Sequence, residues 1–238
     1  MDVKEFSDAF DTLLNSHSFR AQFEDTSFPR DIVLDEYEKS LFLTKAQEEI
    51  VINLYNGKNP FGDSFESTEE MRRYLDSLVK TKTYSTTDEI EGTGVSSNSV
   101  FFKLPTDLAF ITLEQITYDD DSLGCANGTK ANVYPVTQDE YDRVKDNPFR
   151  GPTRYKALRL DYGDGTVEII PKYTIGGYYI KYMAKPSPII LENLPDDLTI
   201  NGVSTKSECK LNPILHNTIL DRAVVMALTS KSVGAKSE

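Results

Sequence analysis

The hydrophobic residues of this 238-residue chain change their spacing near residue 80, and that change limits the folds the chain can adopt. Before it, apolar side chains recur three and four positions apart, as on one face of an α-helix. After it, β-branched and aromatic residues dominate, as they do in strands. We therefore expect an α+β protein with a helical part followed by a β-rich part.

The helical part is expected to be a subdomain over residues 1–80. Residues 34–43 are weakly helical, and a separate, clearer helix is expected to begin at Thr44. Thr44 and Gln47 have the spacing of a capping box, in which each side chain satisfies a backbone N–H at the start of a helix. Gly57 is expected to end that helix, because glycine readily adopts the left-handed conformation found there.

The β-rich part is expected to be an antiparallel β-sandwich or a barrel-like domain over residues 99–211. Residues 81–98, which precede it, are rich in Thr, Ser and Gly and have little periodicity, so a linker or a long exposed loop is expected. The Gly163-Asp164-Gly165 turn predicts a hairpin over residues 157–170. Further strands are expected at residues 99–104, 107–118, 130–136 and 173–183.

The chain is expected to close with a helix over residues 212–229. Asn212 is in the capping position, and Pro213 stands at the first helical position, where its missing N–H costs nothing. The apolar surface of this helix is wide, so we expect it to pack on the core and close the domain. Residues 230–238 are small and polar and are expected to form a flexible tail.

The formal net charge is −12, with 26 Lys and Arg against 38 Asp and Glu. Broad nucleic-acid surfaces need clustered cations, so such binding is not expected. An acidic channel wall would instead repel passing DNA. No signal peptide and no run of eighteen apolar residues occurs, so no membrane is expected as a partner. Cys125 and Cys209 are expected to be free thiols in a reducing compartment.

The sequence contains none of the common catalytic or cofactor-binding motifs. Of its two histidines, His17 is expected in a surface or capping role and His216 in a hydrogen-bonded packing role. The Asp119–Asp121 run lacks the further ligands of a calcium or magnesium site, so we expect a solvated loop. Asp161, Asp164 and Glu168 surround the hairpin turn and could pair as catalytic carboxylates, but turn chemistry explains both aspartates. We therefore expect neither an enzyme nor a cofactor or metal.

Several phrases in the last third of the chain resemble connector proteins of short-tailed phages, of the adaptor or tail-tubular class. They are the strand Tyr178–Tyr182, the Pro-rich crossover Lys185–Leu191, the phrase Ser207–Leu211, and the helix opening Asn212–His216. Three further phrases are similar to structural ring proteins of crAss-like Bacteroides phages: Leu43–Glu49, Val133–Val136 with Glu140, and Asn147–Pro152.

The resemblance implies a structural virion protein of the neck or tail, made in the host bacterial cytoplasm. It would be a subunit of a head-to-tail connector ring, a dodecamer, that joins the portal to the tail. Portal, neighbouring tail or ring proteins would be its partners, and DNA would pass through without specific binding. The alternative is a carbohydrate- or protein-binding module of a phage tail fibre or bacterial surface.

Interaction surfaces are expected in polar segments that gain order on a partner. One is the exposed loop in residues 81–98, and the other is the C-terminal tail. The residues expected to contribute are Asp88, Glu89, Glu91, Asn98, Ser230, Lys231 and Lys236.

Overall fold

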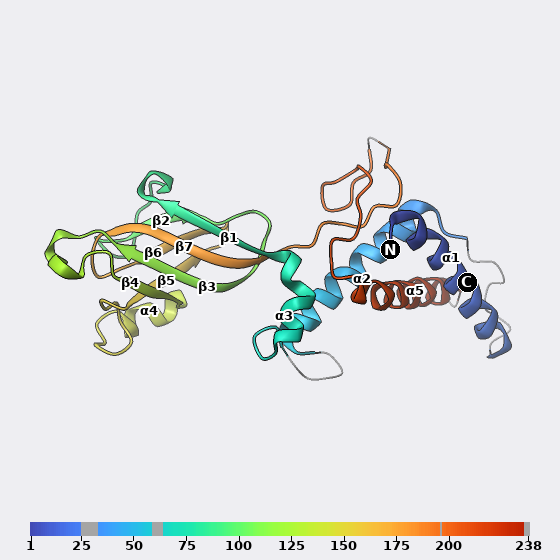
Figure 1. Cartoon of the computed structure of the whole chain (residues 1–238), viewed down its shortest axis with the longest axis horizontal. Coiled ribbons are helices and arrows are strands. Elements are labelled where there is room, and N and C mark those ends of the chain that lie inside the picture. Colours follow the sequence, from blue (N-terminus) through green and yellow to red (C-terminus); the bar gives the residue numbers. More distant parts are fainter. Residues whose placement is uncertain (25–32, 59–63, 196, 236–238) are drawn as a thin grey trace. The chain divides into compact units, whose positions relative to one another are not determined.

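The computed structural model describes residues 1–24, 33–58, 64–195 and 197–235 (Figure 1). The chain forms two compact units. Residues 1–78 and 186–238 make up the helical unit, and residues 79–185 make up the β unit. The chain re-enters the helical unit through residues 186–191, which we call the return segment. The protein is therefore α+β, as the change in hydrophobic spacing predicts.

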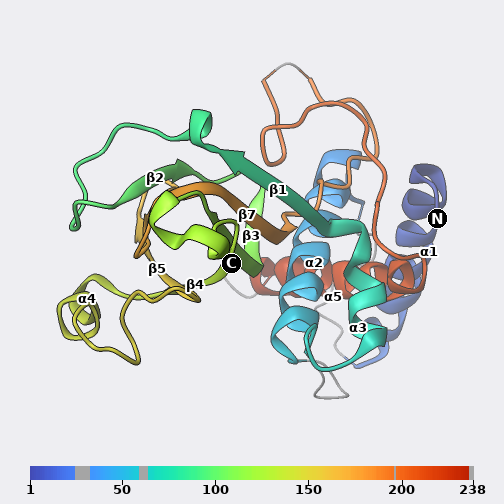
Figure 2. The ribbon, with the colours of Figure 1, turned by 60° about the vertical axis from the view of Figure 1, so that its left-hand side comes forward.

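The helical unit is built around α1, α2 and α5, which lie side by side in both views (Figures 1 and 2). Phe6 and Phe10 of α1 are fully buried, and Phe6 packs against the His216 ring of α5 with the ring centroids 5.3 Å apart. The helices of this unit are α1 (Val3–Glu24), α2 (Glu36–Asn56), α3 (Glu69–Leu75), the 3-10 helix η1 (Asp76–Leu78) and α5 (Ile214–Ala235).

Helix α2 begins well before Thr44. Its N-cap is Asp35, whose side chain accepts a hydrogen bond from the Glu38 backbone N–H at 2.7 Å. Gly57 ends the helix with φ 72°, as predicted from its position. Thr44 and Gln47 lie inside the helix and are buried, so the predicted capping box is wrong. Their spacing fits a cap, but their polar groups bond to another part of the chain.

That other part is the return segment, whose backbone runs along one face of α2. Ser40 Oγ accepts a hydrogen bond from the Leu191 N–H at 2.9 Å, and Thr44 Oγ1 accepts one from the Ile189 N–H at 3.1 Å. The Gln47 amide donates to a third backbone group of the segment at 2.7 Å. The three α2 side chains therefore provide hydrogen-bond partners for the backbone of the return segment, as a neighbouring strand does in a sheet.

The boundary predicted at the end of the β-rich part is therefore corrected. Residues 186–211 belong to the helical unit and not to the β unit. Helix α5 belongs to the helical unit, where it packs on α1 and α2. It also continues to Ala235, so residues 230–235, predicted to be a flexible tail, are helical. The last three residues of that predicted tail lie outside the described residues.

The β unit contains a seven-stranded sheet with the order β1-β7-β3-β4-β5-β6-β2. Neighbouring strands are antiparallel except for β4 and β5, which are parallel. Residues 138–144 form helix α4 (Gln138–Val144), which covers part of its outer face. The strands are β1 (Val79–Ser85), β2 (Val100–Lys103), β3 (Leu108–Tyr118), β4 (Lys130–Pro135), β5 (Lys156–Tyr162), β6 (Thr166–Ile170) and β7 (Ile175–Ala184).

Strand β1 occupies the first part of the segment predicted to be a linker, so the 81–98 boundary is also corrected. Its residues are almost all exposed and polar, and only Tyr84 is fully buried. An edge strand with lysines on its surface suits a sheet margin, because charge discourages pairing with other chains. Because the strand contains few apolar residues, it lacks the alternation of apolar and polar residues that predicts a strand from sequence.

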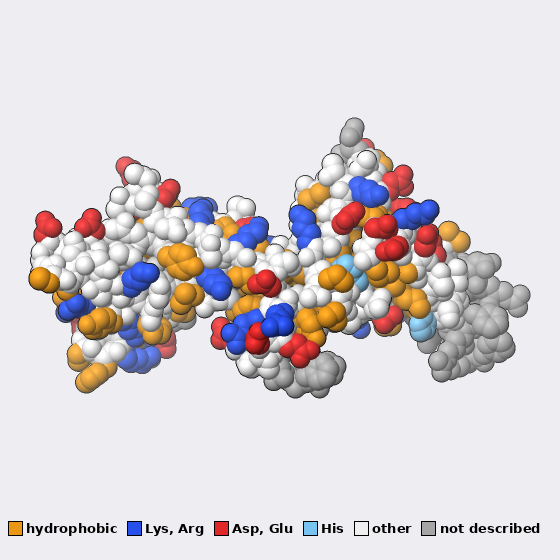
Figure 3. Space-filling view, viewed as in Figure 1, with side chains coloured by type: hydrophobic (Ala, Val, Ile, Leu, Met, Phe, Trp, Pro, Cys, Tyr) orange, Lys and Arg blue, Asp and Glu red, His pale blue; other side chains and the backbone are white. Residues whose placement is uncertain are grey.

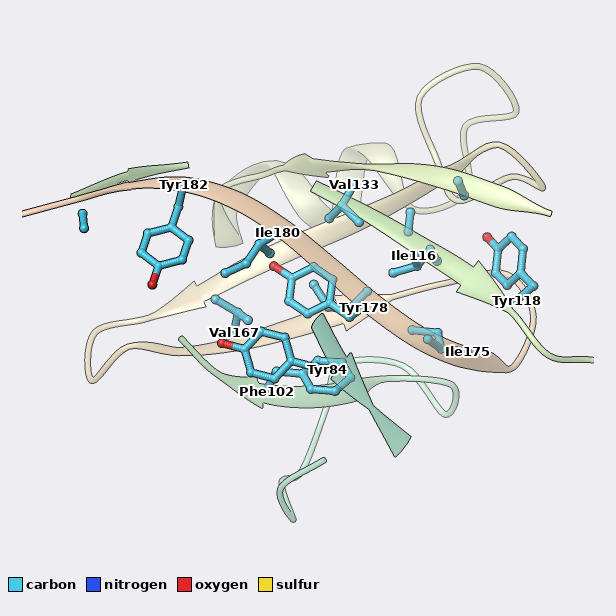
Figure 4. Packing of buried hydrophobic residues seen from close by; sticks show 14 residues of the cluster. Tyr84, Phe102, Ile116, Tyr118, Val133, Val167, Ile175, Tyr178, Ile180 and Tyr182 are labelled. Carbon is cyan, nitrogen blue, oxygen red and sulfur yellow. The ribbon is translucent and has the colours of Figure 1, made fainter. Parts of the chain in front are cut away.

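Contacts between aromatic rings join the two edges of the sheet, so that it curls into a half-barrel (Figure 4). Tyr84 of edge strand β1 lies against Phe102 of edge strand β2, with ring centroids 5.4 Å apart, and against Tyr178 of β7, at 5.5 Å. The Tyr84 hydroxyl donates to the Lys103 carbonyl at 2.8 Å. Of the two predicted β architectures, the barrel-like one is therefore confirmed.

A charged cluster lies within this half-barrel. Glu114 of β3 forms an ion pair with Arg159 of β5 and accepts a hydrogen bond from the Tyr178 hydroxyl. Burial acts to lower the pKa of Arg159, but the neighbouring acidic groups, chiefly the carboxylates of Glu114 and Asp161, together outweigh it and the pKa is raised. Burial and the same carboxylate raise the pKa of Tyr178. These contacts link three strands that are far apart in the sequence.

Candidate assembly surfaces

The loop before β2 is attached to the sheet by a buried carboxylate. Glu168 of β6 accepts hydrogen bonds from the Val95 backbone N–H at 2.8 Å and from the Ser99 hydroxyl. The Ile90 N–H donates to a β2 carbonyl at 3.0 Å. A Cβ on Gly94 would lie 2.4 Å from the Ser99 side chain, so the close approach requires glycine. These hydrogen bonds and this close approach attach the loop to the sheet within one subunit.

The predicted interaction residues of this loop are all at its surface. Asp88 accepts hydrogen bonds from the backbone N–H and the hydroxyl of Ser85, and these lower its pKa. Glu89, Glu91 and Asn98 are exposed on the following turns. The structure thus brings these polar groups onto one ordered loop of the β unit.

The predicted interaction residues at the C-terminus have a different setting. Ser230 is exposed, and its hydroxyl donates to the Ala227 carbonyl at 2.9 Å within α5. Lys231 belongs to the last turns of the same helix. Lys236 lies outside the described residues. Ser230 and Lys231 therefore stand on a helix and not on an extended tail.

Asp120, a candidate metal ligand, and Asp164, a candidate catalytic carboxylate, accept hydrogen bonds within turns. Asp120 accepts from the backbone N–H and hydroxyl of Ser122 and from the Thr174 N–H, and these bonds lower its pKa to about 2. Asp164 accepts from the backbone and hydroxyl of Thr166 across the hairpin. Within the part of the chain that the structure describes, no group of three or more His, Cys, Asp and Glu side chains is placed to hold a metal ion.

His216 is buried and His17 is exposed, which agrees with the roles expected from the sequence. The Nε2 atom of His216 lies 3.1 Å from the Leu211 carbonyl, and burial lowers the pKa of its ring. Cys125 and Cys209 are both free thiols. Among the described helices, none combines the length and the hydropathy that crossing a membrane requires.

Sequence reasoning missed an exposed aromatic side chain on the connection between α4 and β5. Phe149 is 89% exposed. The Asn147 side-chain oxygen accepts hydrogen bonds from the Phe149 and Arg150 N–H groups at 2.9 and 3.1 Å, and the Asn147 carbonyl accepts one from the Gly151 N–H at 2.7 Å. A Cβ on Gly151 would lie 2.6 Å from the Lys145 carbonyl oxygen, so the turn requires glycine. The N-P-F-R-G-P sequence of residues 147–152 indicates a turn. No hydrophobic periodicity in it predicts that Phe149 is exposed.

The helical unit has a hollow at the start of α2. Its volume is about 450 Å³. The walls are partly apolar and partly acidic, and Glu192 receives no hydrogen bond or ion pair from any described residue. The hollow is lined by Leu34, Asp35, Glu36, Tyr37, Glu192, Asn193, Leu194, Pro195 and Leu198. Hydrophobic side chains also reach the surface of the β unit beside Lys and Arg (Figure 3).

The whole sequence, residues 1–238, matches the family described as phage tail ring protein 3/4. The chain therefore belongs to this family of phage tail ring proteins.

Two relatives come from Bacteroides phage crAss001. The chain is 50% identical to its Ring protein 3 over 234 residues, which cover 98% of this chain and 97% of the relative. It is 35% identical to Ring protein 4/5 over 236 residues, which cover 95% of this chain and 92% of the relative. The resemblance to ring proteins of crAss-like Bacteroides phages is thereby confirmed.

Proposed function

We propose that this chain is a non-enzymatic virion protein that assembles with copies of itself into a ring of twelve subunits in the neck or tail. The ring joins the portal, directly or through neighbouring rings, to the tail around the channel through which DNA passes. The observation that carries the proposal is the family match over the whole chain, together with the 50% identity to Ring protein 3. The same match favours a ring over a tail-fibre module.

The charge distribution supports a role beside DNA without specific binding. The helical unit contains 13 Lys and Arg against 23 Asp and Glu, whereas the β unit contains 13 against 15. Excess negative charge repels phosphate and keeps DNA from adhering to a channel wall. We propose that carboxylates outnumber cations on the face toward the channel and that the helical unit supplies most of them.

We further propose docking surfaces for neighbouring rings on the loop that carries Asp88, Glu89, Glu91 and Asn98 and on the end of α5. The loop is already attached to β6, so docking would not require it to fold first. A truncation meant to test the C-terminus should begin after Ala235, because earlier cuts shorten α5.

Electron microscopy of the purified protein, alone and mixed with the portal protein, tests this proposal. We expect closed rings of uniform diameter in the mixture, with the portal stacked coaxially. A variant truncated after Ala235 serves as a comparison for the role of the last residues. Failure to form rings alone, with portal and with neighbouring ring proteins would contradict the proposed function.

A further inference from the structure

The turn that carries Phe149 has a well-fixed backbone but leaves this side chain exposed. Three hydrogen bonds to Asn147 and a required glycine fix the backbone, yet 89% of the Phe149 surface is exposed. Exposing a phenylalanine brings no stability to the isolated chain. A rigid, exposed aromatic side chain is the usual form of an interface anchor, because little conformational freedom is lost when it is buried in a partner.

The surroundings of Phe149 indicate the charge of its partner. Residues 147–156 contain three cations, Arg150, Arg154 and Lys156, and no Asp or Glu. Arg150 is exposed beside Phe149, and no described residue forms an ion pair with it. A surface that buries Phe149 should therefore be apolar at its centre and acidic at its rim.

The hollow at the start of α2 in the helical unit has this chemistry. Leu34, Tyr37 and Leu198 give it apolar walls, and its volume of about 450 Å³ accommodates an aromatic ring. Among its acids, Asp35 caps α2 and Glu36 is paired with a lysine, whereas Glu192 is exposed and has no described partner. The hollow thus offers an unpaired carboxylate at the edge of an apolar recess.

We infer that Phe149 of one subunit inserts into the hollow of the next copy in the ring, with its Arg150 paired to Glu192 of that copy. This inference rests on the proposed ring. The two surfaces differ and lie on different units of the chain, so the contact is head-to-tail. A head-to-tail contact generates a ring when its rotation closes, whereas a contact between two identical surfaces stops at a dimer.

A charge exchange between the two surfaces tests the pairing. Arg150→Glu and Glu192→Arg should each weaken subunit association about tenfold or more, and the double variant should recover most of that loss. Arg143→Glu on α4 and Glu208→Arg in the helical unit are matched reversals of exposed charges outside the two surfaces. Neither should weaken association as strongly, and Arg143→Glu should not rescue Glu192→Arg. Sedimentation velocity over a concentration series gives the association constants.

Photo-cross-linking locates the occupant of the hollow directly. Phe149 is replaced by p-benzoylphenylalanine in full-length protein, and rings are assembled from equal amounts of heavy-isotope and ordinary subunits. We expect mixed-isotope cross-links to residues 33–37 or 192–198. Cross-links to another segment or within one subunit would overturn the inference, as would rings insensitive to the charge reversals. Absence of rings in every preparation would instead refute the proposed function.

Discussion

Replacing Thr44 with valine should destabilise the helical unit strongly for a change that keeps the side-chain shape. The Thr44 hydroxyl is buried in α2 and accepts the Ile189 N–H at 3.1 Å, and it also donates to the Ile189 carbonyl at 3.3 Å. Valine leaves that buried N–H without an acceptor, at a cost of about 1–3 kcal/mol. For a chain of this length, each kcal/mol corresponds to roughly 2–4 °C in the melting temperature.

Urea unfolding followed by circular dichroism measures the loss, with Thr12→Val as the matched control. Thr12 is an exposed residue of α1 whose hydroxyl donates to the Asp8 carbonyl at 2.8 Å. Water replaces that contact, so the control should change stability by less than about 0.5 kcal/mol. Equal effects at the two positions would show that the buried contact between Thr44 and Ile189 does not stabilise the fold. So would a stable Thr44→Asp variant, because aspartate suits a helix cap but not a buried contact.

Leu220→Ala should lower the free energy of unfolding by about 2–5 kcal/mol, because Leu220 is buried in α5. Val225→Ala, at a half-exposed position of the same helix, should lower it far less, and calorimetry measures both variants. Glu168→Ala should speed hydrogen exchange of residues 91–99 in the isolated protein, and Glu91→Ala should not. The folded protein lowers the pKa of Asp120 from 3.8 to about 2, so the Asp120 carboxylate stabilises the fold above about pH 4 and loses that effect as the pH falls toward 2. The difference in unfolding free energy between wild type and Asp120→Asn should therefore shrink over this pH range, as urea titrations measure.

Features decided by local chemistry were predictable from the sequence. Gly57 ends α2 because the last helical turn needs a residue with positive φ, and Gly165 makes the β5–β6 turn in the same way, with φ 82°. The apolar surface of α5 likewise predicted its burial. Each of these depends on residues adjacent in sequence or one or two helical turns apart.

Features decided by distant partners were not predictable. Thr44 and Gln47 have the spacing of a cap, and only the return segment, about 140 positions later, shows that they satisfy its backbone instead. Strand β1 lacks an apolar pattern because it is a polar edge paired with β7. Phe149 is a single residue, and its exposure follows from the turn that Asn147 and Gly151 form around it.

Cryo-electron microscopy of purified virions tests the proposed ring, because it locates the protein and counts its copies together. We expect density for this chain as a closed twelve-subunit ring in the neck or tail, coaxial with the portal. Density at a tail fibre, or absence of the protein from purified virions, would contradict the proposed function.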